Sequence, residues 1–162
     1  MMKIVLIILG AISLISLLFV IISWLFYRKL SCIASFKDTL ETIDLPIIQF
    51  INGQSTFNFV IDTGASNSIL NEEMLADFYY KPLNVEGSVY GIDGNKISTN
   101  CVEIELIANE YKMIEVFQVM NVPAFDNISK QHNDIKIAGV LGGTLLKKYG
   151  LKIDYEHFTL TK

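Results

Sequence analysis

A run of 24 uncharged residues near the amino terminus constrains this chain more than any other feature. Residues 4–27 carry no charge, and 20 of them are apolar. At about 1.5 Å rise per residue, a helix of this length reaches roughly 36 Å, enough to cross a hydrocarbon core of about 30 Å. A helix also satisfies its own backbone polar groups, which lipid cannot do. The run predicts a transmembrane anchor over residues 1–29, with membrane lipid as the partner of residues 4–27.

The flanks of this run leave its processing and orientation open. Trp24 and Tyr27 suit the lipid–water interface, and Arg28 and Lys29 come next as a stop. The alternative is a cleaved signal peptide, whose apolar core is usually about 7–15 residues and is followed by small residues. The positive charges at the two ends of the run give only a slight preference for a cytoplasmic domain. The short basic start of this chain, Met-Met-Lys, instead resembles bacterial signal-anchors, which export the domain that follows them. We expect a single-pass membrane protein, with the side of its domain left open.

Charge and composition exclude several classes of function for the rest of the chain. The 162 residues suit one folded domain beside the anchor, and the net charge is −4. The first 29 residues hold three basic groups and no acid, so the remainder carries 10 basic and 17 acidic residues. This balance argues against a nucleic-acid partner, whose phosphates need a basic surface. Two cysteines and two scattered histidines predict no disulfide framework and no metal site, and nothing in the sequence calls for a cofactor.

Residues 45–162 read as a β-rich domain after a juxtamembrane linker at 30–44. Strands are expected at 46–51 and 57–61, joined at Asn52-Gly53, a dipeptide typical of type I′ hairpin turns. Apolar residues alternate with Glu103 and Glu105 over 102–106, which predicts a strand with one dry face. Further strands are expected over residues 112–120, 152–155 and 158–160.

Two short helices interrupt this β pattern. Asn71 can cap the first helix, whose first turn holds Glu72 and Glu73. The second begins with the hydroxyl of Thr144 and ends at Gly150, a residue suited to the left-handed backbone at the end of a helix. The two helices therefore lie before and after the long β-rich middle of the domain.

The most informative stretch for chemistry is 59–66, Phe-Val-Ile-Asp-Thr-Gly-Ala-Ser. An apolar strand delivers Asp62 into a tight turn that Gly64 permits. A carboxylate at the end of a buried strand is costly unless it is hydrogen-bonded or paired. A turn-capping aspartate is the simpler interpretation, but the strand before the acid and Ala65-Ser66 after it favour a functional role.

This stretch resembles the active-site loop of retropepsin-like aspartic proteases. Residues 138–146, Ala-Gly-Val-Leu-Gly-Gly-Thr-Leu-Leu, are similar to the second family element, which threads beneath that loop and braces it. Residues 147–155 resemble the ending of bacterial members. The resemblance implies an all-β, single-lobe acid-protease barrel with two short helices over 45–162. Ala138 and Thr144 depart from residues common in relatives, at positions that are not catalytic.

The resemblance also implies a mechanism that needs two chains. Pepsin-like enzymes carry two Asp-Thr-Gly loops, whereas this chain has one, and Asp154 is not followed by Thr-Gly. A homodimer would pair two Asp62 side chains, which share a proton and activate a water against a peptide or protein substrate. Loop support is implied for Thr63, Gly64, Ala65, Ser66, Val140, Leu141 and Gly142.

A hairpin over 89–97 resembles the flap that closes over the substrate in this family. Tyr90-Gly91 is similar to the flap dipeptide of pepsin-type enzymes, and Asp93-Gly94 would form the hairpin tip. The alternative is an ordinary surface hairpin.

Two other functions are compatible with parts of the sequence. Residues 61–68 also resemble the first phosphate loop of actin-like ATPases, but about 118 residues cannot hold the two nucleotide-clasping halves which that fold needs. A catalytically silent, membrane-tethered module that dimerises or binds peptides fits the same residues as a protease, because an intact Asp-Thr-Gly loop does not by itself prove turnover.

Overall fold

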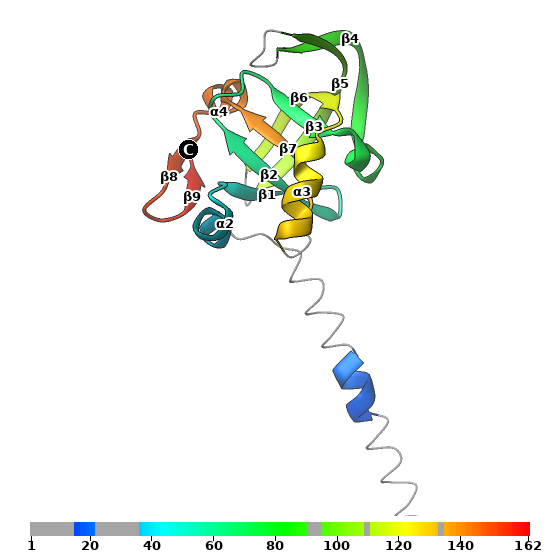
Figure 1. Cartoon of the computed structure of the whole chain (residues 1–162), viewed down its shortest axis with the longest axis vertical. Coiled ribbons are helices and arrows are strands. Elements are labelled where there is room, and N and C mark those ends of the chain that lie inside the picture. Colours follow the sequence, from blue (N-terminus) through cyan, green and yellow to red (C-terminus); the bar gives the residue numbers. More distant parts are fainter. Residues whose placement is uncertain (1–14, 22–35, 91–94, 109–110, 133–134) are drawn as a thin grey trace, which may run out of the picture. The chain divides into compact units, whose positions relative to one another are not determined.

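The computed structural model describes residues 15–21, 36–90, 95–108, 111–132 and 135–162 (Figure 1). The chain divides into two compact units, Met1–Ile33 and Ala34–Lys162. In the first unit, residues 15–21 are helical and exposed. Within the described ranges no helix has both the length and the apolar character needed to cross a membrane. Most of the predicted span at 4–27 lies outside those ranges.

The second unit is a closed six-stranded β-barrel, which confirms the fold class expected for this domain. Its strands neighbour one another in the order β1-β2-β7-β3-β6-β5, and Ile51 of β1 pairs with Ile107 of β5 to close the ring. The sheet has one more strand, β4, which among the described strands pairs with β5 alone. The bounds are β1 Ile47–Asn52, β2 Ser55–Asp62, β3 Ser68–Asn71, β4 Tyr80–Tyr90, β5 Lys96–Ala108, β6 Tyr111–Met120 and β7 Ile137–Gly142.

Alternating apolar side chains fill the barrel. Val102, Ile104 and Leu106 of β5 are at most 4% exposed, so the dry face predicted for this strand is confirmed. On its wetter face, Glu103 and Glu105 form ion pairs with lysines of the neighbouring strands. The interior also holds a group of aromatic rings, namely Phe50, Phe57, Phe59, Phe78 and Phe117.

The first hairpin forms as predicted, but its turn is displaced by one residue. Asn52 pairs with Ser55, so the two-residue loop is Gly53-Gln54. Gly53 has a φ of +61°, whereas Gln54 has no positive φ, and a type I′ turn would need both. Asn52 is therefore the last strand residue, and its buried side chain binds the backbone of Tyr79 and Glu105.

Both predicted helices are present. The first is a 3-10 helix, η1 (Glu72–Asp77), whose Glu73 N–H donates to the Asn71 side chain. The second is α4 (Gly143–Tyr149), which ends at Gly150 with a φ of +66°.

Two further helices were not predicted. The first, α2 (Phe36–Ile43), lies within the stretch expected to be a linker, and its Phe36 ring contacts Tyr155 and Phe158 edge-on. The second, α3 (Pro123–Gln131), packs Phe125 against β1, β2 and β7. Each helix is short and is held by contacts far along the chain, so local periodicity gave no signal.

The chain ends in a separate two-stranded sheet, β8 (Lys152–Asp154) with β9 (Thr159–Thr161). These strands agree with the predicted ones to within about one residue. The turn between them is organised by Asp154, which accepts hydrogen bonds from the backbone N–H groups of Glu156 and His157.

Candidate active site

Asp62 is the last residue of β2 and is exposed at the end of that strand. Its Oδ1 accepts a hydrogen bond of 2.8 Å from the backbone N–H of Gly64, and its carbonyl accepts one of 3.2 Å from Ala65. A Cβ added to Gly64 would lie 3.2 Å from that same Oδ1, which is a tight contact, so glycine makes this close approach easier. The loop therefore holds one carboxylate oxygen in place and presents the acid to the outside of the lobe.

Strand β7 runs parallel to β2 directly beneath this loop. Val140, Leu141 and Gly142 pair with Val60, Ile61 and Asp62 in register. Leu141 is fully buried, and Val140 is half-buried on the other face. The two strands therefore end together, and the turn into α4 begins beside Asp62.

The glycines of β7 allow the loop and the strand to lie in contact. A Cβ on Gly142 would lie 2.6 Å from the carbonyl oxygen of Asn67 and 2.9 Å from that of Ala65. A Cβ on Gly139 would lie 2.1 Å from the carbonyl oxygen of Ile69. Side chains at either position would force the backbone apart, since real Cβ atoms do not approach so closely.

The start of α4 is hydrogen-bonded to the loop above it. The Gly143 N–H donates to the Ala65 carbonyl at 2.7 Å, and the Thr144 N–H donates to the Ser66 carbonyl at 3.2 Å. The Thr144 hydroxyl donates to the same Ser66 oxygen. The Ser68 hydroxyl accepts from the Gly142 N–H. Thr144, a departure from the family pattern in the sequence, thus binds the loop with both its backbone and its side chain.

The predicted flap is a β-hairpin in its described part. Tyr90 pairs with Lys96 and Val89 with Ile97, which joins the end of β4 to the start of β5. Figure 1 shows these two strands extending beyond the barrel. Gly91, Asp93 and Gly94 lie outside the described residues, as does the side chain of Tyr90. The hairpin's base is therefore described, whereas its tip is not.

The flap base and the active-site loop line a partly open cavity of about 270 Å³. Its lining comes from the loop at Gly64, Ala65, Ser66 and Asn67, from β4 at Ser88 and Val89, and from Ile69 and Gln118. These segments are far apart in the sequence, and the fold brings them together around one cavity. The lining begins at Gly64, two residues after Asp62 in the chain.

A second hollow, of about 520 Å³, opens on another side of the loop. Its lining includes Thr63, Gly143, Leu146, Leu151 and Ile153. Thr63, the second residue of the Asp-Thr-Gly loop, is exposed here. The lining is apolar at Leu146, Leu151 and Ile153, and it also includes Lys147 and Lys152.

Asp154 is not placed as a second catalytic acid. One of its oxygens accepts the two backbone hydrogen bonds of the β8–β9 turn, and the other lies 2.8 Å from the His157 ring nitrogen Nδ1. The pKa of Asp154 is lowered, chiefly by the hydrogen bond from the backbone N–H of His157. The carboxylate is thus committed to the turn.

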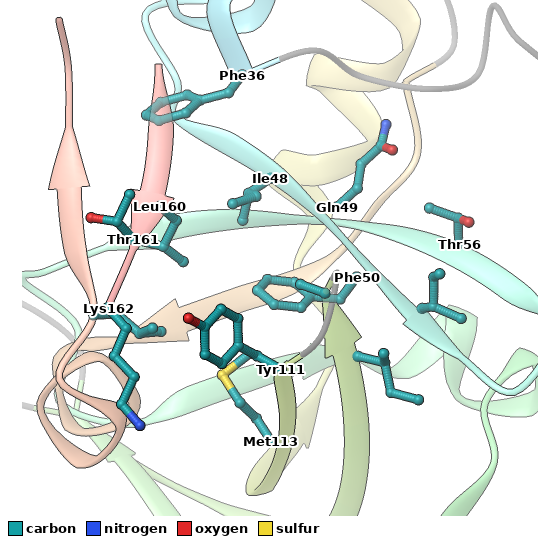
Figure 2. Close-up of a pocket in the computed structure, with 14 residues that line it drawn as sticks. Phe36, Ile48, Gln49, Phe50, Thr56, Tyr111, Met113, Leu160, Thr161 and Lys162 are labelled. Atoms are coloured by element: carbon teal, nitrogen blue, oxygen red, sulfur yellow. The ribbon is translucent and has the colours of Figure 1, made fainter. Parts of the chain in front are cut away.

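A third hollow, of about 410 Å³, lies away from this chemistry (Figure 2). Figure 2 shows Phe36 of α2, Phe50 of β1, Tyr111 and Met113 of β6 and Leu160 of β9 around it. None of its lining residues belongs to the Asp62 loop or to the described part of the flap, and none carries a carboxylate side chain.

Three residues near the loop were missed by the sequence analysis. Gln118 lines the cavity, and Thr99 lies behind it on β5. A Cβ on Gly87 would lie 2.8 Å from Thr99 Oγ1, so a side chain at this point of β4 would have to displace Thr99 or its neighbours. The sequence offered one signal for Gln118, which is its polar side chain between Phe117 and Val119. That pattern is also typical of an ordinary strand with one face in solvent, so it did not indicate a site.

The closed six-stranded barrel and the braced Asp-Thr-Gly loop define this domain as a retropepsin-like aspartic protease lobe. The aspartyl protease family profile matches residues 50–145, and the chain belongs to that family. Its fold is similar to EIAV protease in complex with the inhibitor HBY-793, with a TM-score of 0.51 and 17% identity over 68% of this chain and 92% of that one. The retroviral protease-like domain of Ddi1 from Leishmania major matches with a TM-score of 0.49 and 18% identity, over 71% of this chain and 85% of that domain. Among curated protein sequences, none matches this chain.

Proposed function

We propose that this protein is an aspartic endopeptidase whose active site forms between two copies of the chain. The observation that carries the proposal is the Asp62 carboxylate, exposed at the end of β2 and held by the Gly64 N–H at 2.8 Å. This arrangement occurs in a lobe of the aspartyl protease family. Family membership supports hydrolysis of peptide bonds, and the geometry of the loop supports Asp62 as the catalytic residue.

Two copies are needed because the chain supplies one such acid. The sequence holds a single Asp-Thr-Gly, and the Asp154 carboxylate is committed to a turn. The hollow beside Thr63 is largely apolar, with Lys147 and Lys152 also in its lining, and it is a surface that a second lobe would cover. A twofold axis there would bring both loops together. Thr63 would then hydrogen-bond across the axis, and Gly64 would allow the chains to approach.

In such a dimer the two Asp62 carboxyls share one proton, because two adjacent negative charges repel. The ionised carboxylate takes a proton from a water held between the two groups, and that water attacks the peptide carbonyl carbon. The protonated carboxyl donates to the carbonyl oxygen. The peptide C–N bond then breaks as the carboxyl that took the water's proton donates it to the leaving nitrogen. A hydroxyl of the collapsing gem-diol returns one proton to the other carboxylate, which restores the shared proton.

The remaining predicted site residues would act by position. Ala65 and Ser66 carry the carbonyls that accept from α4, and Val140, Leu141 and Gly142 support the loop from beneath. The flap, with Tyr90, Gly91, Asp93 and Gly94 near its tip, would close over the substrate and exclude water.

We also propose that residues 4–27 anchor the enzyme in a membrane as a single-pass protein. The support is the length and apolar character of that run in the sequence. Confinement to a membrane raises the local concentration of lobes, so a weak dimer interface would suffice there. Carbonate extraction of membranes from expressing cells tests this, because a deletion of residues 4–27 should release the protein.

Peptide-library cleavage by the full-length chain in detergent micelles tests the enzymatic proposal, with Asp62→Asn as the control. The parent should cleave a subset of peptides, and the variant should lose activity by about 10²-fold or more while keeping the parent's melting temperature. Equal hydrolysis by both proteins would remove Asp62 from the mechanism. Binding of peptides without cleavage by the parent would instead identify the catalytically silent module.

A further inference from the structure

The cavity between the active-site loop and the flap base has an unusual polar residue in its wall. Loop and flap residues provide most of the lining of this 270 Å³ space, and Gln118 comes from strand β6. Because Gly64 is only two residues from Asp62, a substrate residue near the scissile bond would occupy this cavity. This placement rests on the proposed peptidase function.

Gln118 faces away from the barrel interior. Its neighbours Phe117 and Val119 are buried in the core, so the alternation of the strand puts Gln118 on the opposite face. It pairs with Ile69 of β3 on one side and with Cys101 of β5 on the other. Thr99, two residues before Cys101, shares that face.

Gln118 and Thr99 are nevertheless buried, and one side-chain oxygen of each has no hydrogen-bond partner. Gln118 is 8% exposed and Thr99 is 6% exposed. Across the described part of the chain, only Gln118 Oε1 and Thr99 Oγ1 are buried side-chain polar atoms with no partner. Buried polar atoms are normally paired, because an unpaired one forfeits its hydration without compensation. Of these two residues only Gln118 lines the cavity, so a group bound there is placed to supply the hydrogen bond that Gln118 lacks.

Gly87 fixes these side chains beneath the flap base. A Cβ at this position would lie 2.8 Å from Thr99 Oγ1 and 2.9 Å from Gln118 Nε2. Strand β4 therefore lies close over the polar pair and excludes water from that side. Gln118 lines the cavity together with Ile69 and Val89, and the same cavity is lined by the active-site loop.

We propose that Gln118 makes this cavity a specificity subsite for a substrate residue with an uncharged, hydrogen-bond-donating side chain. Asn, Gln, Ser and Thr donate a hydrogen bond that Gln118 Oε1 can accept once the Gln118 amide turns toward the cavity, and they complete the unpaired group. Leu and Val would leave it unpaired, so the enzyme should reject apolar residues of the same shape. A lysine or arginine would bring its charge into a site that offers no carboxylate among its lining residues.

Matched substrates test this preference in the full-length chain in detergent. Asn and Leu are similar in shape, as are Thr and Val, so peptides carrying these pairs at each position around the scissile bond isolate the hydrogen bond. At one position we expect kcat/KM to favour Asn over Leu by about 10-fold. Gln118→Met should abolish or reverse this ratio at that position and leave the other positions unchanged. Gln54→Met, in the exposed β1–β2 turn, is the matched control and should keep the parent profile.

A second variant keeps the test decisive if Gln118→Met does not fold. Gln118→Glu has nearly the same shape and should move the preference at that position to Lys. An unchanged positional profile in the folded variants, or a parent that prefers Leu at every position, would overturn the subsite while leaving the peptidase function intact.

Binding measurements separate this inference from the enzymatic proposal. Asp62→Asn chains should bind the Asn peptide more tightly than the Leu peptide by a similar factor, measured by fluorescence anisotropy. If the parent cleaves nothing, this binding ratio and its loss in Asp62→Asn/Gln118→Met still support the subsite. Equal binding of both peptides, or no binding, would reject it.

Discussion

Gly142 lies beneath Asn67 at a distance that leaves no room for a side chain, since an added Cβ would be 2.6 Å from the Asn67 carbonyl oxygen. Gly142 also pairs with Asp62 across the parallel β2–β7 ladder. One residue thus sets both how closely the loop lies over β7 and where β2, which ends at Asp62, stops pairing.

Gly142→Ala should displace the loop and reduce activity more than its effect on stability would explain. Overpacking of this kind costs about 1–3 kcal/mol, and the loop backbone must move to relieve it. Peptide hydrolysis and thermal melting measure the two effects. Asn71→Ala is the control: it removes the side-chain cap of η1, away from the loop and from the proposed dimer surface, and costs about 1 kcal/mol. It should lower the melting temperature and keep kcat/KM, and equal activity loss in both variants would contradict a local effect at Gly142.

Activity should depend on two intact copies of Asp62. If equal amounts of parent and Asp62→Asn chains pair at random, about a quarter of all dimers should contain two parent chains. At a fixed total concentration, the initial rate should therefore fall to about a quarter of the rate of the parent alone. Diluting the parent should lower its specific activity once monomers dominate. A rate that falls only to one half on mixing, and does not change on dilution, would mean that each chain carries a complete site.

Lys148 should stabilise the domain through a buried carboxylate. Its ammonium donates to Glu115 Oε2 at 3.0 Å and to the Ile114 carbonyl at 2.7 Å, and the hydrogen bond to Glu115 is the main cause of its raised pKa. Glu115 is only 7% exposed, so Lys148→Met leaves a buried charge unpaired and should cost about 1–3 kcal/mol in urea unfolding. The double variant Glu115→Gln/Lys148→Met should be more stable than Lys148→Met alone. Strictly additive effects would show that the two side chains do not interact.

Asp154 should make stability depend on pH in the acid range. Its pKa is lowered in the folded chain from the ordinary value of 3.8, mainly by the backbone N–H of His157. The ionised form is therefore favoured by folding, so its contribution is complete above the unfolded pKa and is lost as the pH falls through the lower folded pKa. Asp154→Asn should lower the melting temperature at pH 6, and the difference should shrink below about pH 4. Glu156→Gln, an exposed neighbour, should show a smaller difference at pH 6, and equal curves for both variants would argue against the turn contacts.

Several features of the fold could be read from local sequence. The strand alternation around Ile104, the cap at Asn71 and the left-handed end of α4 at Gly150 all form as predicted. Each depends on interactions within a few residues, so the local pattern carries the information.

Other features depend on contacts that no local pattern contains. The side chain of Asn52 binds Tyr79 and Glu105, 27 and 53 residues away, and so acts within the barrel rather than in the turn. Helix α2 is a short segment whose Phe36 finds its aromatic partners at the opposite end of the chain. The polar character of Gln118 was visible in the sequence, but its burial without a partner was not.

The sequence by itself determined the chemistry that this protein can offer: one Asp-Thr-Gly loop, a glycine-rich strand to support it, and a strand pattern for an all-β domain. These are local properties, set by side-chain type and by backbone freedom at glycine. Only the tertiary structure decided what surrounds the acid. Barrel closure brings β4 and β6 to the loop, places Gln118 in the cavity wall and turns Asp154 away into a hairpin, because these placements depend on strand register and packing between residues far apart in the chain.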